Sequence, residues 1–411
     1  MWRLTAAVQE EKRQKSVYLT SFIHRDELFD IAERWFCGHL SPNDGLRLTQ
    51  ILISDGFVLG ETLENLAKDL MKRIYQEPIK QKRIHFKGEL REALCRGVGV
   101  VTERELELFS LYRMNPDFYY REAPIDGVMC LDDGGLLIGL YRIKRPRRIA
   151  EKANRKIANW IFGIVQSKAQ EMAAERARKY GISLELLLTP ESEMAREFVE
   201  AETAIAQSFS EGSVKFDREA LSINDVGGIK IVACDEHLSD LEDALHQDRG
   251  IRILEKESFS GSFRAKSLVL ECSWDPERAF RRYRECRCWQ KYLNRGISQN
   301  DLAKGLESML QDPKTTINVE LILSNFPDLV ESELGNSIHE ERIIAQRDSK
   351  VYQGYIPMNV EFLLEYLFAV GFSPQIQTDH LPIKLWGRYL PDTLISYMRQ
   401  LYQLPVQDLF Y

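Results

Sequence analysis

A short alternating run, residues 317–323, constrains this chain more than any other part of its sequence. Val319, Leu321 and Leu323 recur at every second position, which is the period of a β-strand with one buried face. Glu320 lies in the middle of the opposite face. Burying a carboxylate is costly unless a cation meets it. We therefore expect a strand that presents Glu320 to a functional cation or to metal-bound phosphate.

The composition is that of an ordinary globular protein. The chain has 411 residues, 44% hydrophobic and 28% charged, which is enough for two or three domains. Its net charge of −7 argues against a nucleic-acid coat protein, so any affinity for phosphate must be local. No apolar run approaches the roughly 20 residues that span a bilayer, and the N-terminus lacks the apolar core of a signal peptide. We expect a cytoplasmic protein without membrane association.

The seven cysteines are expected to be reduced. No pair has the Cys-x-x-Cys spacing that structural zinc sites use. Cys286 and Cys288 flank an arginine in a cationic stretch, a setting that can lower a thiol pKa. Reduced thiols are nevertheless the rule in the cytosol.

The chain is expected to divide into three parts. Helical periodicity dominates residues 1–125, which we interpret as a helical N-terminal domain. Residues 126–345 combine strand-like and helical runs, with a helical insertion at about 157–212, and predict a mixed sheet flanked by helices. Residues 346–411 are expected to form a helical C-terminal extension.

Within the middle part, turn and cap residues place the elements. Asp132-Asp-Gly-Gly135 between two apolar runs predicts a hairpin. A long helix is expected from about residue 147 to Tyr180, ending at Gly181. Further helices are predicted at about 191–208 and 238–247, and strands at 229–233, 267–272 and 317–323.

A basic segment follows the predicted hairpin. Arg142 and Lys144 would project from a strand end, and Arg148, Lys152 and Lys156 share a helical face at four-residue spacing. Such cations could surround a triphosphate, where charge builds on oxygen during transfer. The alternatives are a solvated helix face or a nucleic-acid patch.

An aspartate stands just before the strand predicted at 229–233. Asp225 could present one carboxylate to Mg²⁺, which takes oxygen ligands, and Lys230 lies within the strand itself. An ordinary turn is the alternative. For Asp225 and Glu320 to act together, their two strands must be neighbours. Glu271 is a rival strand carboxylate, ranked lower because no matching motif follows it.

Residues 255–267 could receive an aromatic ligand. Phe263 could stack on a base, with Lys266 as a nearby cation. Phe263 could equally be a core residue.

The order of these features resembles the synthetases of the RelA/SpoT class. These enzymes make the alarmones pppGpp and ppGpp by moving pyrophosphate from ATP to a ribose 3′-hydroxyl. Their last motif contains Glu-x-Gln-x-Arg-Thr, then Ala-Glu-x-Gly and a His. Its spacing is matched without a gap by Glu320, Glu333, Gly335 and His339. The Gln, Arg and Thr positions hold Ile322, Ser324 and Asn325.

Three earlier motifs of that family also have counterparts. The donor motif Arg-x-Lys, Ser, Lys is matched by Arg142, Lys144 and Lys152, with Arg148 at the Ser position. The motif Asp-x-x-Gly-x-Arg is matched by Asp225 and Gly228, with Lys230 at the Arg position. The acceptor motif has a Tyr that stacks on guanine and a His, and here those positions hold Phe263 and Ser267.

The resemblance implies an α/β (α+β) nucleotidyltransferase-like fold and Mg²⁺-dependent pyrophosphate transfer. The acceptor would be GDP, GTP, another nucleotide or the 3′ end of tRNA. Asp225 and Glu320 would be the catalytic residues and metal ligands. ATP would bind Arg142, Lys144, Arg148 and Lys152; the acceptor would bind Phe263, Lys266, Glu333 and His339; Lys230 would hold further phosphate.

A long interval separates Lys152 from Asp225, so residues 213–218 are an alternative donor segment.

Two alternatives to this function stay open. The lost motif positions fit a catalytically inactive nucleotide- or RNA-binding protein on the same fold. A helical interaction protein with a chance motif match is the third reading.

Overall fold

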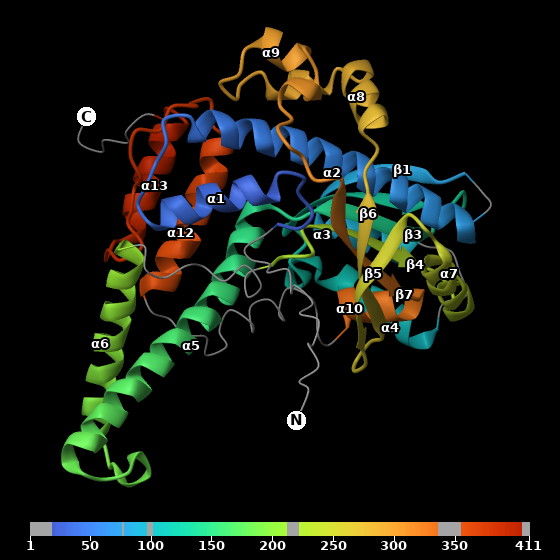
Figure 1. Cartoon of the computed structure of the whole chain (residues 1–411). Coiled ribbons are helices and arrows are strands. Elements are labelled where there is room, and N and C mark those ends of the chain that lie inside the picture. Colours follow the sequence, from blue (N-terminus) through green and yellow to red (C-terminus); the bar gives the residue numbers. More distant parts are fainter. Residues whose placement is uncertain (1–18, 76–77, 97–101, 212–221, 336–354, 405–411) are drawn as a thin grey trace, which may run out of the picture.

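The sheet is the frame of the molecule. The computed structural model describes residues 19–75, 78–96, 102–211, 222–335 and 355–404. Seven strands are ordered β1-β2-β3-β4-β7-β6-β5, and all neighbours are antiparallel except the parallel pair β4 and β7. The predicted mixed α/β sheet flanked by helices is therefore confirmed (Figure 1). The strands are β1 (Lys80–Phe86), β2 (Pro124–Leu131), β3 (Leu137–Ile143), β4 (Gly227–Val232), β5 (Ile251–Phe259), β6 (Ala265–Ser273) and β7 (Thr316–Ser324).

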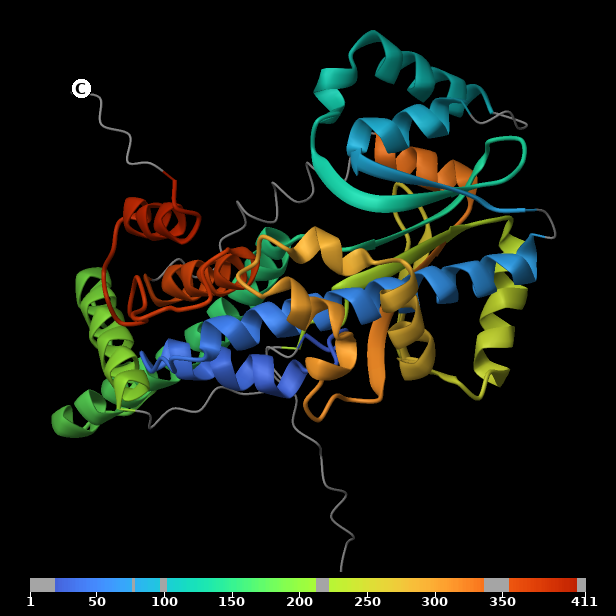
Figure 2. The same ribbon diagram turned by 90° about the horizontal axis from the view of Figure 1, so that it is seen from above.

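Helices cover the two faces of the sheet unequally. On one face, α2 packs on β3 and β4, and α12 packs on α2 and α5. On the other face, α3, α4 and α10 form a smaller second core with the strands (Figure 2). The helices are α1 (Arg25–Phe36), α2 (Asp44–Ile74), α3 (Lys87–Arg96), α4 (Glu103–Met114), α5 (Pro146–Tyr180), α6 (Glu191–Ser210), α7 (Asp235–Gln247), α8 (Pro276–Glu285), α9 (Gln299–Ala303), α10 (Phe326–Leu334), α12 (Tyr355–Phe372) and α13 (Pro391–Leu401).

The strand β7 has the alternation that its sequence predicts. Val319, Leu321 and Leu323 are at most 2% exposed and belong to the main core. Glu320 lies on the opposite face, which the helices leave partly open. Burial of the apolar set fixes the register, because a slip of one residue would exchange the two faces.

Two strands were not predicted from the sequence. The strand β1 pairs with β2, so residues 1–125 add a strand to the sheet as well as helices. The strand β5 pairs with β6 at the opposite edge. Most of their side chains are exposed or partly exposed, and such edge strands lack a strong apolar alternation.

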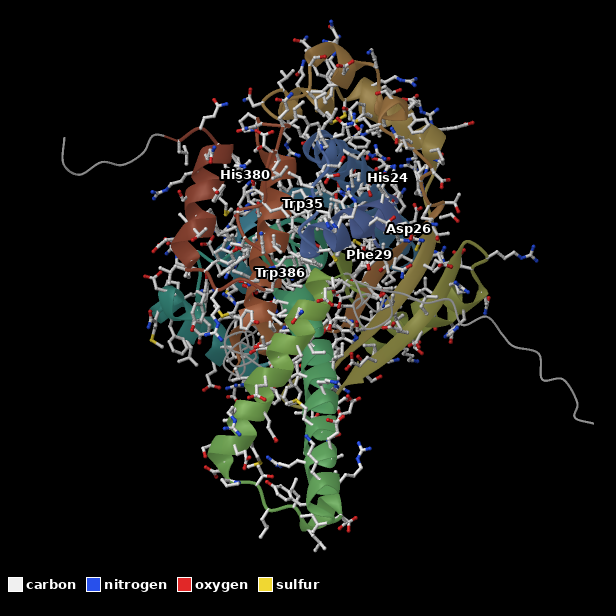
Figure 3. The ribbon with its side chains drawn as sticks, turned by 60° about the vertical axis from the view of Figure 1, so that its left-hand side comes forward. His24, Asp26, Phe29, Trp35, His380 and Trp386 are labelled. Carbon is white, nitrogen blue, oxygen red and sulfur yellow. A yellow bond between two sulfur atoms is a disulfide. The ribbon has the colours of Figure 1, made fainter. Side chains whose placement is uncertain are left out.

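The helices α1 and α12, from the two ends of the chain, pack against each other. The side chain of Trp35 in α1 is fully buried (Figure 3). Its ring centroid lies 6.0 Å from that of Tyr366 in α12. Its indole N–H donates to Asp44 at 2.9 Å. His24 Nδ1 lies 2.6 Å from the carboxylate of Asp55 in α2, and both side chains are buried. These polar contacts satisfy buried groups that would otherwise destabilise this packing.

The helices α5 and α6 form an arm that extends from the body (Figures 1 and 3). The first turn of α5 contains Pro146, and the helix ends at Gly181, whose φ of 66° is left-handed. These ends agree with the predicted helix. The N-terminal turns of α5 lie near the sheet, which brings Lys152 to the end of β3 and the start of β4.

The expected reduced state of all seven cysteines does not hold in the structure. Cys286 and Cys288 form a disulfide with two-residue separation. Arg287 between them has a left-handed φ of 48°, which turns the chain so that the two sulfur atoms meet. Within the described residues, none of the helices is both long enough and apolar enough to cross a membrane.

The contact between α2 and β3 gives a stability prediction. A Cβ at Gly139 would lie 2.7 Å from the backbone oxygen of Lys230 and 2.1 Å from Met71 Cε. We expect Gly139→Ala to lower the free energy of unfolding by about 1–3 kcal/mol through overpacking. Urea denaturation measures this change.

Gly163 in α5 is the matched control, because a Cβ there meets nothing within 4 Å. Gly163→Ala should raise stability by up to about 1 kcal/mol, since alanine favours a helix interior. Equal urea midpoints for the two variants would contradict the packing described here.

Candidate active site

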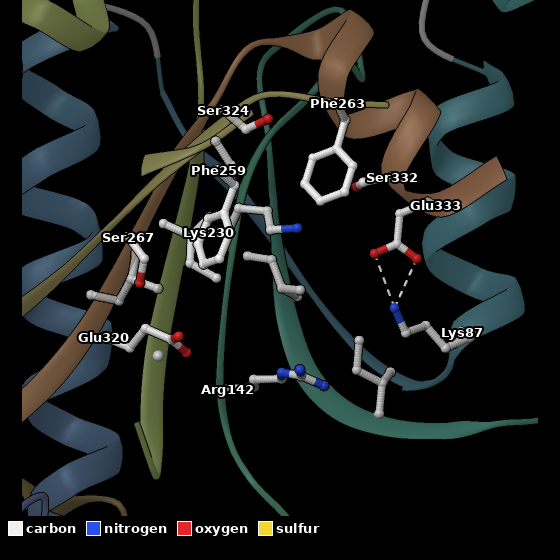
Figure 4. A pocket seen from close by; sticks show the side chains of 16 residues that line it. Lys87, Arg142, Lys230, Phe259, Phe263, Ser267, Glu320, Ser324, Ser332 and Glu333 are labelled. Atoms are coloured by element: carbon white, nitrogen blue, oxygen red, sulfur yellow. Dashed lines mark hydrogen bonds and ion pairs between the residues drawn. The ribbon is translucent and has the colours of Figure 1, made fainter. Parts of the chain in front are cut away.

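A cavity of about 230 Å³ opens on the face of the sheet opposite α2. It lies between the β5–β6 hairpin and the helices α3 and α10 (Figure 4). Its floor is formed by β3, β4, β7 and β6. The polar and aromatic side chains that line it are Lys87, Arg142, Lys230, Phe259, Phe263, Ser267, Glu320, Ser324, Ser332 and Glu333.

Strand register places the charged groups in rows across the floor. Arg142, Gly228 and Glu320 occupy successive positions across β3, β4 and β7. Gly228 lacks a side chain between the arginine and the glutamate, so the middle of this row is open. A Cβ at Gly228 would lie 3.4 Å from Glu320 Oε2. The next row contains Lys230 beside Ile322, so a half-buried cation follows the open position.

Two lysines and two carboxylates meet beside the cavity, and Glu320 is the member of this group that lines it. Lys144 follows β3, and its ammonium contacts Asp225 and lies 3.4 Å from Glu320 Oε2. Lys152 of α5 contacts the same Asp225 oxygen. The predicted adjacency of the Asp225 and Glu320 strands is therefore present, because β4 and β7 are paired.

Burial in this cluster disfavours the protonated form of both lysines. Burial, together with the smaller effect of the neighbouring charge of Lys144, lowers the pKa of Lys152 to about 6. Burial also lowers the pKa of Lys144. The nearby carboxylates raise the pKa of these lysines by less than burial lowers it. A bound polyphosphate would supply negative charge and stabilise their protonated forms.

Lys230 is the cation of the cavity floor. Burial lowers its pKa to about 8. Within the described residues, its ammonium makes no hydrogen bond or ion pair. A half-buried cation that lines a cavity favours an anionic ligand.

A buried ion pair closes one end of the cavity. Lys87 Nζ lies 3.0 and 2.8 Å from the two carboxylate oxygens of Glu333 (Figure 4). Arg91 donates to the backbone oxygen of Glu333 at 3.0 Å and lies 3.4 Å from its carboxylate. All three side chains are nearly inaccessible. Glu333 therefore lines the cavity with its carboxylate already compensated.

The remaining wall is aromatic and hydroxylic. Phe263, in the turn between β5 and β6, and Phe259, at the end of β5, both border the cavity (Figure 4). Ser267, Ser324 and Ser332 add hydroxyl groups. An aromatic wall with a few hydroxyl groups can hold a planar base by stacking and hydrogen bonding.

Some predicted site residues lie elsewhere. Arg148 pairs with Glu151 at 2.8 Å and does not line the cavity. Lys266 pairs with Glu242 of α7 at 2.8 Å and lines a neighbouring cavity. The rival Glu271 pairs with Arg252 at 2.6 Å near the sheet edge. His339 and the alternative donor segment 213–218 lie outside the described residues.

Sequence analysis missed Lys87, Arg91 and Phe259 as parts of the site. Lys87 and Arg91 are separated from Glu333 by more than 240 positions, so no local pattern connects them. Phe259 had a detectable signal, since a second aromatic precedes Phe263 in the same short loop region.

The donor set for a metal ion is small. No group of three or more His, Cys, Asp or Glu side chains that could hold a metal occurs among the described residues. Asp225 and Glu320 nevertheless share one cation, the ammonium of Lys144. Mg²⁺ is commonly bound by one or two carboxylates together with substrate phosphates. The two carboxylates therefore fit an ion that arrives with a nucleotide.

No protein-family model matches the chain, and no curated protein matches it. Among solved structures, it is similar to small alarmone synthetase 2 from Bacillus subtilis, with 12% identity, a TM-score of 0.19, and coverage of 36% of this chain and 64% of that chain. It is also similar to small alarmone synthetase 1 from Bacillus subtilis, with 9% identity, a TM-score of 0.19, and coverage of 41% and 69%, respectively. The chain thus matches just under two thirds of the first protein's length. A likeness of this extent does not define a reaction, which has to be argued from the side chains.

The ion pair at the closed end of the cavity gives a second prediction. Glu333→Gln leaves Lys87 and Arg91 buried without their carboxylate. We expect the free energy of unfolding to fall by about 3 kcal/mol, as when one partner of a buried pair is removed. Urea denaturation measures the loss.

Glu331→Gln, two residues earlier in α10, is the control. Glu331 pairs with the partly exposed Arg104 at 3.1 Å, and such a pair is worth less than about 1 kcal/mol. If both variants lost the same small amount of stability, the buried pair would not have the role assigned to it.

Proposed function

We propose that this protein transfers pyrophosphate from ATP to the 3′-hydroxyl of a nucleotide or of tRNA. The observation that carries the proposal is the position of one ammonium, that of Lys144, against the carboxylate of Asp225 just before β4 and that of Glu320 on the parallel strand β7. These groups adjoin a cavity with a cationic floor and an aromatic wall. In phosphoryl transfer, cations stabilise the charge on the phosphate oxygens, and carboxylates hold a metal ion or accept a proton.

In the proposed reaction, the triphosphate is held by Arg142, Lys144, Lys152 and Lys230. The acceptor base stacks on Phe263. Glu320 accepts the proton of the 3′-hydroxyl, whose oxygen attacks the β-phosphorus of ATP. The bond from that phosphorus to the α–β bridging oxygen breaks, and AMP leaves with that oxygen. Mg²⁺, held by Asp225 and Glu320 with phosphate oxygens, would neutralise charge on the transferred group.

A catalytically inactive nucleotide-binding protein is the second candidate. Ile322 is the observation that favours it, because an apolar side chain stands beside Lys230 on the cavity floor. The RelA/SpoT-type motif has a polar Gln at that position. Nucleotide binding that is indifferent to Mg²⁺, with no transfer to any acceptor, would support this alternative.

A transfer assay distinguishes the candidates. ATP labelled in its β and γ phosphates would be incubated with Mg²⁺ and with GDP, GTP, ADP, ATP or bulk tRNA. We expect a labelled acceptor with the wild-type protein and at least about 100-fold less with Glu320→Gln, since positioned general bases contribute that much. Glu271→Gln is the matched control, because Glu271 lies on the adjacent strand β6 but pairs with Arg252. Wild-type activity in Glu320→Gln would falsify the assignment.

The pKa of Lys230 predicts the pH dependence of nucleotide binding. In the free protein this pKa is lowered to about 8, and an anionic ligand would raise it. Affinity for a non-hydrolysable ATP analogue should therefore fall as pH rises above about 8, by up to about tenfold per pH unit. Calorimetric titrations between pH 7 and 9.5 would measure it.

Lys230→Arg tests the assignment, because arginine keeps its charge over this pH range. The decline above pH 8 should be clearly shallower in Lys230→Arg, where only Lys144 and Lys152 still titrate, whereas Lys230→Met should bind weakly at every pH. A decline that persists unchanged in Lys230→Arg would show that another group titrates.

A further inference from the structure

A basic surface lies on the long excursion of the chain that connects two neighbouring strands of the sheet. The strands β6 and β7 are antiparallel neighbours, yet residues 274–315 intervene between them and contain α8 and α9. This excursion stands at the top of the molecule in Figure 1. Within it, residues 276–295 contain seven Arg or Lys and two acidic residues, although the whole chain has a net charge of −7.

We define the basic ridge as six exposed cations of this stretch. Its members are Arg278, Arg281, Arg282, Arg284, Arg287 and Lys291. The β5–β6 hairpin that carries Phe263 begins at the other end of β6 from α8. The ridge is therefore a surface separate from the cavity.

Part of the ridge is neutralised by neighbouring acids. Arg278 lies 3.1 Å from Glu61 of α2, and Arg282 lies 4.0 Å from the same carboxylate. Arg284 pairs with Glu307. These pairs hold one side of α8 against α2 and against the segment around Glu307, later in the same excursion.

Three ridge cations have no acidic partner within the described part of the chain, namely Arg281, Arg287 and Lys291. Arg281 lines a polar cleft of about 240 Å³ between α2 and α8. The acidic side chains of that cleft are Glu61, Glu64 and Glu285, and Lys68 pairs with Glu64. Arg287 stands on the turn beyond α8, where its left-handed backbone breaks the helical path.

We propose that the basic ridge binds the phosphodiester backbone of a nucleic acid. Five of its six cations are arginines, whose planar fork of donors matches phosphate oxygens. A membrane surface fits less well, because proteins that bind one usually also insert apolar side chains into it. Around the ridge, Leu293 is the large apolar side chain that is exposed among the described residues, at 42%. The binding is electrostatic and independent of base sequence.

The test uses the whole protein and four fluorescent probes, a 30-nucleotide single-stranded RNA, its duplex, and the two DNA equivalents. Anisotropy would be followed from about 50 to 200 mM salt. Wild-type protein should bind at least one probe, with affinity that falls linearly on a logarithmic salt axis. No salt-dependent binding to any probe would overturn the proposal, as would binding only to anionic lipid vesicles.

The variant Arg281→Ala/Arg287→Ala/Lys291→Ala should weaken binding at least about tenfold. For a single strand, removing three phosphate contacts should reduce the salt slope by about 2. Lys72→Ala/Lys179→Ala/Arg249→Ala is the matched control, because it removes the same charge from exposed positions outside the ridge. Equal affinities of the two triple variants would overturn the proposal.

A further variant keeps the test decisive. If the triple variant failed to fold by circular dichroism, Arg281→Gln/Arg287→Gln would replace it and should reduce the salt slope by about 1.4.

Discussion

The parallel pairing of β4 with β7 is the constraint on which the candidate site depends. It sets Gly228 beside Glu320 and Lys230 beside Ile322, and it brings Asp225, just before β4, to the end of the sheet where Lys144 leaves β3. The main core fixes this register, because burial of the apolar side of β7 leaves Glu320 on the open face. Packing on one face of the sheet thus determines the chemistry on the other.

The charges of two clusters, one around Glu333 and one around Lys144, are compensated to different degrees. In the first, Glu333 has its carboxylate compensated by Lys87 and Arg91, so this group stabilises the wall. In the second, Lys144 and Lys152 share one carboxylate, and burial lowers the pKa of both lysines. The first group is complete in the free protein, and the second gains most from an added anion.

The elements that sequence analysis predicted best have strong local patterns. The strand around Glu320 has a strict apolar alternation, and Gly181 marks the end of α5 by its left-handed backbone. The strands β1 and β5 escaped prediction because edge strands with exposed side chains lack that alternation. The pairing of Lys87 with Glu333 could not be predicted, since it depends on how α3 and α10 pack rather than on spacing in the chain.

The departures from the RelA/SpoT-type motif have a physical reading in this cavity. The Gln and Arg positions of the motif hold Ile322 and Ser324, so β7 contributes one carboxylate to the floor and no cation. The strand cations that line the cavity are Arg142 of β3 and Lys230 of β4. The positive charge of the floor therefore lies on the β3 and β4 side of Glu320. A ligand with phosphate groups would meet this charge on one side of Glu320, and that asymmetry would set the orientation of the ligand over the carboxylate.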